Sequence, residues 1–152
     1  SNDWGYIAGS TSTNQAGSYG TRNKTSLAGL PGARAYGAAW VDENNNFWLY
    51  GGTGFAQTTS GTFKLITQVT SSINIPVNGK LSDVWMYDTT KQLWTWKSGT
   101  NVANDNVTLP APGVTSVNIY PAGRTQPFLW HDKAQKAIYL FGGRVGVDDS
   151  EY

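Results

Sequence analysis

The stretch LYGGTGF, residues 49–55, returns near the other end of the chain as LFGGRVG, residues 140–146. In both copies an aliphatic and an aromatic residue precede two adjacent glycines. Glycine gives up more conformational freedom on folding than any other residue, so a glycine pair is costly unless the backbone requires it. Its return after a second apolar run indicates a repeated structural unit.

Several other residues keep nearly the same spacing as the glycine pairs. The pairs that lie 90 positions apart are Trp4 with Trp94, Gly9 with Gly99, Arg34 with Arg124, and Trp40 with Trp130. The glycine pairs lie 91 positions apart, because one residue is added in the turn after the aspartate that follows each tryptophan. Because the spacing stays nearly constant over so many residues, the sequence predicts a duplicated unit.

The composition predicts an all-β fold in one domain of 152 residues. The chain has 18 Gly, 7 Trp and 8 Tyr, and only 14% of its residues are charged. Short runs of Trp, Tyr, Phe, Val and Ile stand between clusters of Gly, Asn, Ser and Thr, as in β-proteins. No apolar stretch shows helical periodicity.

One unit of the repeat is predicted to form four antiparallel strands, with a long insertion between the second strand and the third. The expected strands cover residues 34–41, 46–50, 81–88 and 93–99. The turn DENNN, residues 42–46, joins the first two, because Asn and Asp cap their own backbone in turns. A Thr- and Ser-rich insertion, residues 53–77, follows, and residues 63–77 alternate well enough for a separate hairpin. The pair Asn78-Gly79 is expected to form a turn.

The double glycine followed by Tyr87, six further residues and Trp94 resembles the signature of kelch-repeat β-propellers, the superfamily of the galactose oxidase central domain. The segment SDVWMYD, residues 82–88, is also similar to kelch repeats. The resemblance implies blades of four antiparallel strands, although the spacing of 90 exceeds the usual kelch unit of about 50 residues. The positions that carry the structural motif are Arg34, Gly51, Gly52, Asp83, Trp85, Tyr87, Trp94, Arg124, Gly142 and Gly143.

The resemblance divides the chain into parts of successive blades. Residues 1–10 are expected to be the last strand of a preceding blade, residues 31–100 a complete blade with the insertion 53–77, and residues 121–152 the first half of the next blade. A propeller has 4–8 blades, so this chain forms an incomplete propeller. The remaining blades are expected from the same polypeptide or from neighbouring copies.

The resemblance also assigns structural roles to the motif residues. The glycines are expected to adopt positive φ where the backbone turns close to a neighbouring blade. Arg34 is expected to pair with Asp83 and so to tie the first strand to the third. The aromatic residues expected to pack between adjacent sheets are Trp40, Trp48, Tyr87 and Trp94.

The sequence predicts no catalytic, cofactor-binding or metal-binding residue. His131 is the single histidine, and its counterpart in the first unit is Val41, so it is expected to be a strand-end residue. The copper site that the galactose oxidase comparison suggests requires several histidines and a cysteine, and the chain has no cysteine. The acidic loop GVDDSEY, residues 146–152, does not follow the EF-hand pattern, but its oxygen-rich side chains leave Ca²⁺ binding as an alternative.

Charge and composition also indicate where the protein acts. The net charge of +1 without a Lys/Arg cluster does not predict nucleic-acid binding, and no apolar run has the length of a membrane span. Asn23 and Asn106 begin N-x-Thr triplets, which are potential N-glycosylation sites. Low charge and many Ser, Thr and Asn residues favour an extracellular or cell-surface glycoprotein.

Three functions remain open at this stage. The leading hypothesis is a non-enzymatic scaffold that binds a protein or a glycan with its loops, above all residues 53–77 and 101–120. The first alternative is part of a galactose oxidase-like copper oxidase whose catalytic residues lie outside this segment. The second alternative is a structural surface or filament protein, in which blades or insertions contact further copies.

Overall fold

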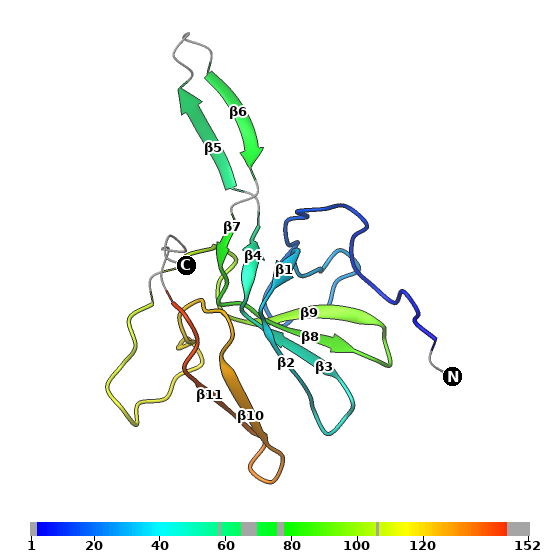
Figure 1. Ribbon diagram of the computed structural model, residues 1–152, viewed down its shortest axis with the longest axis vertical. Coiled ribbons are helices and arrows are strands. Elements are labelled where there is room, and N and C mark those ends of the chain that lie inside the picture. Colours follow the sequence, from blue (N-terminus) through cyan, green and yellow to red (C-terminus); the bar gives the residue numbers. More distant parts are fainter. Residues whose placement is uncertain (1–2, 58, 65–69, 76–77, 106, 146–152) are drawn as a thin grey trace.

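The computed structural model describes residues 3–57, 59–64, 70–75, 78–105 and 107–145, and these residues form β-strands without any helix (Figure 1). The predicted all-β class is therefore confirmed. The strands are β1 (Arg34–Ala35), β2 (Ala38–Val41), β3 (Phe47–Tyr50), β4 (Thr53–Phe55), β5 (Thr59–Lys64), β6 (Thr70–Ile75), β7 (Asn78–Lys80), β8 (Val84–Asp88), β9 (Leu93–Ser98), β10 (Phe128–Asp132) and β11 (Ala137–Phe141).

The largest sheet has four antiparallel strands in the order β2-β3-β8-β9. These strands lie within the four expected ranges of the repeat unit. The turn between β2 and β3 is closed by Asp42, whose carboxylate accepts hydrogen bonds from the backbone N–H groups of Asn44 and Asn46 at 2.9 Å. Trp48 Nε1 also donates to this carboxylate, at 2.8 Å. The expectation that DENNN forms a capped turn is confirmed.

The expected first strand, residues 34–41, is interrupted. Tyr36 has a left-handed φ of 59°, so the chain leaves one sheet after β1 and enters another at β2. β1 pairs with β4, whereas β2 pairs with β3. Regular β-strands have a negative φ, so the left-handed conformation of Tyr36 separates β1 from β2.

The insertion after β3 builds a second, three-stranded sheet in the order β1-β4-β7, and β5 and β6 form a hairpin that extends away from both sheets (Figure 1). A separate hairpin was predicted for residues 63–77, but the observed hairpin begins earlier, because its first strand is Thr59–Lys64. The expected turn at Asn78-Gly79 is wrong, because both residues belong to β7 and pair with Phe55 and Gly54 of β4. Gly79 suits this strand because the side chain of Asn104 packs where a Cβ would lie.

The described strands of the second unit form the hairpin of β10 and β11, which lies beside β2 (Figure 1). The isolated bridge between Thr125 and Arg144 repeats the pairing of Ala35 with Thr53 in the first unit. Trp130 stacks on Tyr139 with 5.3 Å between ring centroids, as Trp40 stacks on Trp48 at 5.5 Å. The hairpin therefore reproduces the β2–β3 hairpin of the first unit.

Left-handed backbone positions show how far the duplication extends. Seven pairs of residues with positive φ keep a spacing of 90 or 91, although the side chains often differ. The pairs are Gly9 with Gly99, Asn14 with Asn104, Asn23 with Gly113, Tyr36 with Gln126, Asn45 with Lys136, Gly51 with Gly142, and Gly52 with Gly143. The repeat predicted from the sequence is thus a repeat of backbone conformation.

Residues 101–120, which the kelch resemblance leaves out, belong to this internal repeat. Turns in this segment match turns in residues 11–30. Ser26 accepts a hydrogen bond on its Oγ from the N–H of Ala28, and Ser116 accepts one from Asn118, each at 3.2 Å. The turns that end at Lys24 and Val114 are also equivalent.

Residues 3–10, expected as part of a last strand, form no strand in this structure. Trp4 is fully exposed, and Tyr6 and Ile7 are largely exposed. A strand needs a hydrogen-bonded neighbour, and no described strand is paired with this segment.

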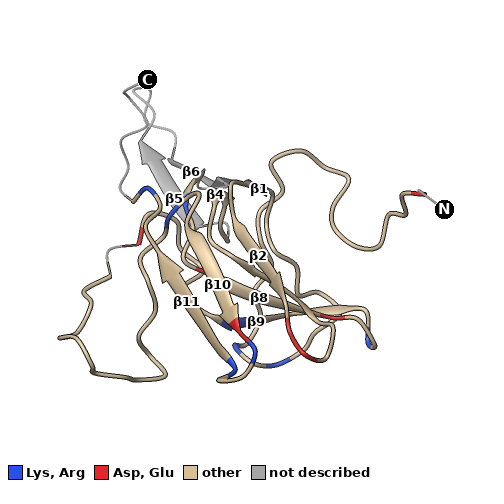
Figure 2. Cartoon of the chain, turned by 60° about the horizontal axis from the view of Figure 1, so that its bottom comes forward, with Lys and Arg blue, Asp and Glu red and all other residues tan. Residues whose placement is uncertain are grey.

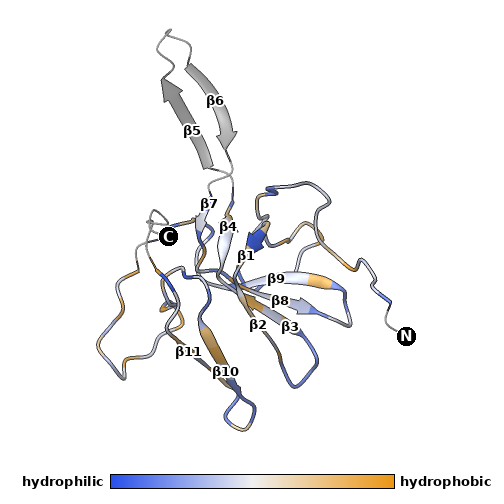
Figure 3. Cartoon of the chain, viewed as in Figure 1, coloured by the Kyte–Doolittle hydropathy of each residue, from blue (hydrophilic) through white to orange (hydrophobic). Residues whose placement is uncertain are grey.

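The main core lies on the face of the four-stranded sheet that residues 15–30 cover. Trp85, Tyr19 and Trp96 form its buried cluster, with Trp94 partly buried against it. Of the aromatic residues expected between sheets, Trp40 and Trp48 face the β10–β11 hairpin, whereas Tyr87 and Trp94 lie on the opposite face. The first half of β10 is hydrophobic (Figure 3), and charged residues lie mostly in turns and at strand ends (Figure 2).

Candidate functional site

A buried pair of opposite charges forms the polar centre of the first unit. Arg34 Nη1 lies 2.6 Å from Asp83 Oδ1, and Arg34 Nη2 donates to Oδ2 at 2.8 Å. Arg34 extends from β1, and Asp83 directly precedes β8, so the pair joins the two sheets. The predicted ion pair between Arg34 and Asp83 is present.

Two aromatic side chains complete the hydrogen bonds of Asp83. Tyr19 OH and Trp85 Nε1 both donate to Asp83 Oδ2 at 2.7 Å. Burial, reinforced by the charge of Asp83, raises the pKa of Tyr19, so its hydroxyl stays protonated as a donor. Burial alone would lower the pKa of Arg34, but the hydrogen bonds and charge of Asp83 outweigh it and raise the pKa. Removing either partner of this enclosed pair would leave a buried charge uncompensated, and the centre presents no reactive group to solvent.

Arg124 occupies the corresponding place in the second unit. Arg34 Nε donates to Gly32 O and its Nη1 to Gly51 O, at 3.2 and 3.1 Å. Arg124 makes the equivalent bonds to Ala122 O and Gly142 O, at 3.0 and 2.9 Å. Each arginine therefore fixes the double glycine of its own unit.

The double glycines adopt the positive φ expected for them: 63° at Gly51, 94° at Gly52, 67° at Gly142 and 85° at Gly143. Gly52 N–H donates to Arg124 O at 2.9 Å, and a Cβ on Gly51 would lie 2.9 Å from the same oxygen. The first glycine pair thus packs against the backbone of the second unit. A Cβ on Gly142 would meet no atom within 4 Å.

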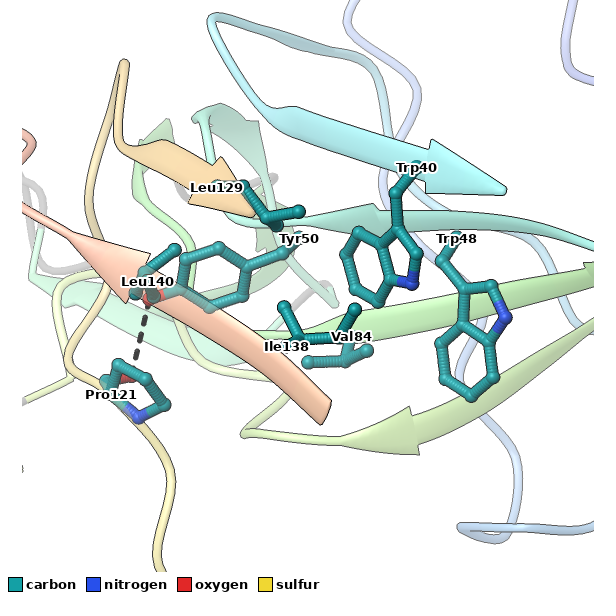
Figure 4. A pocket seen from close by; sticks show the side chains of 8 residues that line it. All are labelled: Trp40, Trp48, Tyr50, Val84, Pro121, Leu129, Ile138 and Leu140. Atoms are coloured by element: carbon teal, nitrogen blue, oxygen red, sulfur yellow. Dashed lines mark hydrogen bonds between the residues drawn. The ribbon is translucent and has the colours of Figure 1, made fainter. Parts of the chain in front are cut away.

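The two units also meet through side chains. Tyr50 OH donates to Ala122 O at 2.9 Å, and burial raises the pKa of Tyr50 to about 12. Beside this bond lies an apolar cavity of about 290 Å³ between the four-stranded sheet and the β10–β11 hairpin (Figure 4). Its lining residues are Trp40, Trp48, Tyr50, Val84, Pro121, Leu129, Ile138 and Leu140.

His131 lies on the same junction and bonds to the first unit. Its Nδ1 lies 3.1 Å from Val41 O, and its Nε2 lies 3.3 Å from Glu43 Oε1. It belongs to β10, as a strand residue paired with Ile138. Its partners are one backbone carbonyl and one carboxylate of the first unit, so His131 bridges the two units.

Other candidates from the sequence are placed as follows. Asn23 is exposed at a left-handed turn, where its side chain is accessible. Asn106, Asp148, Asp149 and Glu151 lie outside the described residues. Asp105 accepts a hydrogen bond from Tyr120 OH at 2.9 Å, and burial together with this carboxylate raises the pKa of Tyr120.

The described residues contain no group of three or more His, Cys, Asp or Glu side chains that could hold a metal ion. Within the same part of the chain, no helix has the length and hydrophobicity of a membrane span. Comparison of the chain with known families, curated proteins and solved structures finds no family model, protein or structure that matches it.

Sequence reasoning missed the role of Tyr19 and the repeat of the segment that carries it. The signal lies in Thr25-Ser26 and Thr115-Ser116, which are 90 positions apart, as are Asn14 and Asn104. Aligning these polar residues would have placed residues 11–30 within the unit. The pairing of Tyr19 with Asp83 has no such signal, because 64 residues separate them.

Proposed function

We propose that the chain is a non-enzymatic scaffold and binding module, a segment of an extracellular kelch-type β-propeller that holds a protein or glycan partner on its loops. The observation that supports this proposal best is the serial packing of two equivalent units, with Gly52 of one bonded to Arg124 of the next. Serial packing of small sheets is how propellers and other repeat proteins build a rigid frame. Binding is then a property of the loops.

The β5–β6 hairpin is the strongest candidate for the binding loop. It extends away from both sheets (Figure 1), and in the described part of the chain each of its strands pairs only with the other. Its outer edges therefore offer backbone N–H and C=O groups to an extended peptide. Thr, Ser and Asn predominate in its sequence, and their hydroxyl and amide groups suit sugar hydroxyls as well.

The connection of β4 to β7 allows a sharp test. Phe55 pairs with Asn78, so residues 58–77 can be replaced by a short Asn-Gly turn without changing the three-stranded sheet. Ala56 stays in this variant because it is buried against Leu81. The intact chain and the shortened chain would be applied to a printed glycan array and to a displayed library of extended peptides.

We expect the intact chain to select related peptides or glycans and the shortened chain to lose them. Leu27→Ser, at an exposed position outside both candidate binding loops, is the matched control and should bind like the intact chain. Equal binding by the intact and shortened chains would contradict a site on the hairpin. Release of hydrogen peroxide from a sugar alcohol would contradict the non-enzymatic proposal and favour a copper oxidase.

An extracellular location is part of the same proposal, and Asn23 provides its test. Its exposed side chain can accept a glycan if the chain is secreted by a eukaryotic cell. We expect the secreted chain to lose mass on glycosidase treatment, and Asn23→Gln to remove a share of that mass. A secreted chain of unmodified mass would contradict glycosylation.

A further inference from the structure

The hairpin β10–β11 has one covered side and one open side. Leu129, Ile138 and Leu140 point toward the first unit and line the cavity between the units (Figure 4). The opposite side, which we call the open aromatic face, consists of Phe128, Trp130, Tyr139 and Phe141. Trp130 is 57% exposed and Phe141 is 79% exposed. So large an aromatic surface on neighbouring strands indicates an interaction site.

The first unit shows what covers such a face. The residues equivalent to the open aromatic face are Ala38, Trp40, Trp48 and Tyr50, which are buried or half-buried. They pack against the covered side of the next hairpin. Gly51 likewise has a carbonyl of the next unit beside it, whereas the equivalent Gly142 has open space. The second unit therefore has the shape of an acceptor for one more unit of the same kind.

The chain also presents the complementary surface. The counterparts of Leu129, His131 and Ile138 in the first unit are Ala39, Val41 and Phe47, which are exposed, whereas Leu49, the counterpart of Leu140, is partly buried against the main core. We call the three exposed residues the rear face. In the junction inside the chain, the residues at these positions form the side that contacts the preceding sheet.

A cavity beside the rear face supports the inference that another molecule binds there. It has a volume of about 220 Å³ and is lined by Phe47, Tyr87, Trp94 and residues 7–8. Phe47 belongs both to the lining of this cavity and to the rear face, so a neighbour that binds the rear face would also cover the cavity.

We propose that the open aromatic face binds the rear face of a second copy of this chain, head to tail, through a junction equivalent to the one between its own two units. The inference deepens the proposed scaffold function and rests on the equivalence of the units, not on the β5–β6 hairpin. Because the two surfaces differ, each added copy leaves one of each free. Such heterologous contacts form rings when the rotation closes and filaments when it does not.

Two substitutions test the two faces separately. Phe141→Asp places a charge in the open aromatic face, and Phe47→Asp places one in the rear face. Val117→Asp introduces the same charge at a position that is 90% exposed and belongs to neither face. The mass of the 152-residue chain and of each variant would be measured by sedimentation velocity over a range of concentrations, after circular dichroism shows that each is folded.

We expect the unchanged chain and Val117→Asp to associate as concentration rises, and each face variant alone to remain monomeric. A mixture of Phe141→Asp with Phe47→Asp retains one intact face of each kind. It should form a dimer of one chain of each type and nothing larger. Should Phe47→Asp fail to fold, Val41→Asp tests the same rear face.

Other outcomes would overturn the proposal. An unchanged chain that stays monomeric at all concentrations would contradict it, as would dimers of Phe47→Asp alone, which would show that two open aromatic faces bind each other. Retention on the glycan array that Phe141→Asp abolishes would assign the face to a sugar. None of these results bears on the hairpin, which the shortened chain tests separately.

Discussion

The two stacked aromatic pairs have nearly the same geometry in different surroundings. Trp40 and Trp48 lie 5.5 Å apart at 14°, and Trp130 and Tyr139 lie 5.3 Å apart at 26°. The first pair is half-buried by the next hairpin, whereas the second is largely exposed. The comparison shows that each hairpin is shaped by its own turns and strand pairing, while burial of its aromatic face depends on the following unit.

The two arginines extend the comparison to the polar centre, and substitution at each should give the largest difference between units. Arg34→Met leaves the buried carboxylate of Asp83 without its charged partner. Breaking such a pair typically costs about 3–5 kcal/mol. We expect Arg34→Met to lower the free energy of unfolding by about this amount, and Arg124→Met, whose arginine donates to the backbone carbonyls of Ala122 and Gly142, to lower it less. Urea denaturation of both variants measures the difference.

If the two arginine substitutions lowered the free energy of unfolding equally, the ion pair with Asp83 would not explain the importance of Arg34. Unchanged stability of Arg34→Met would contradict any stabilising role for the pair. Asp83→Asn is a second test of the same ion pair, because it keeps the shape of the side chain and removes its charge.

The tyrosine at the junction predicts a loss of stability in alkali. Burial raises the pKa of Tyr50 from the ordinary value of 10 to about 12. Above pH 10 the unfolded chain ionises this phenol while the folded chain does not, so stability is complete below pH 10 and falls as the pH rises toward 12. A shift of this size corresponds to roughly 3 kcal/mol.

Thermal unfolding between pH 9 and pH 12, about the range in which a tyrosine titrates, measures this loss. Burial raises the pKa of Tyr19 as well, so part of the alkaline loss should remain in Tyr50→Phe. Phe141 is the natural counterpart of Tyr50 without a hydroxyl, and Phe141→Tyr, at an exposed position, should leave the pH profile unchanged. A Tyr50→Phe profile identical to that of the unchanged chain would contradict the assignment.

The equivalent glycines measure the contact between units directly. Gly51 and Gly142 have φ of 63° and 67°, but a Cβ would meet Arg124 O only at Gly51. A left-handed conformation costs a non-glycine residue about 1–2 kcal/mol. We therefore expect Gly142→Ala to cost about 1 kcal/mol and Gly51→Ala at least about 2 kcal/mol, both measured by urea denaturation. If Gly51→Ala and Gly142→Ala cost the same free energy, the backbone at the junction would accommodate the added Cβ without strain.

The sequence predicted those parts of the fold that local residues determine. Glycine pairs, the Asp42 turn and the alternating strands each impose a short-range conformation, and the repeat made them visible twice. The break at Tyr36 and the strand at Asn78 were missed, because tertiary pairing with β4 overrides the local preference of these residues.

The binding surfaces could be predicted only in part. Arg34 and Asp83 were paired correctly because the resemblance supplied their roles. The open aromatic face was not foreseen, since Trp130 and Tyr139 have the same residue types as buried aromatics, and only their neighbours decide exposure. Likewise His131 was expected to be a plain strand-end residue, and its bridge to Glu43 depends on how two separate hairpins meet.

This bridge predicts the smallest effect, because Glu43 is partly exposed and water weakens the interaction. Glu43→Gln keeps a hydrogen-bond acceptor beside His131 Nε2 but removes the charge, so we expect a change in stability below about 1 kcal/mol. Asp88→Asn is the control for the loss of a surface charge. Its partner Lys91 lies in the same turn, away from the junction. If Glu43→Gln cost more than Gly51→Ala, side-chain charge rather than backbone packing would hold the two units together, and the comparison of glycines would no longer measure their contact.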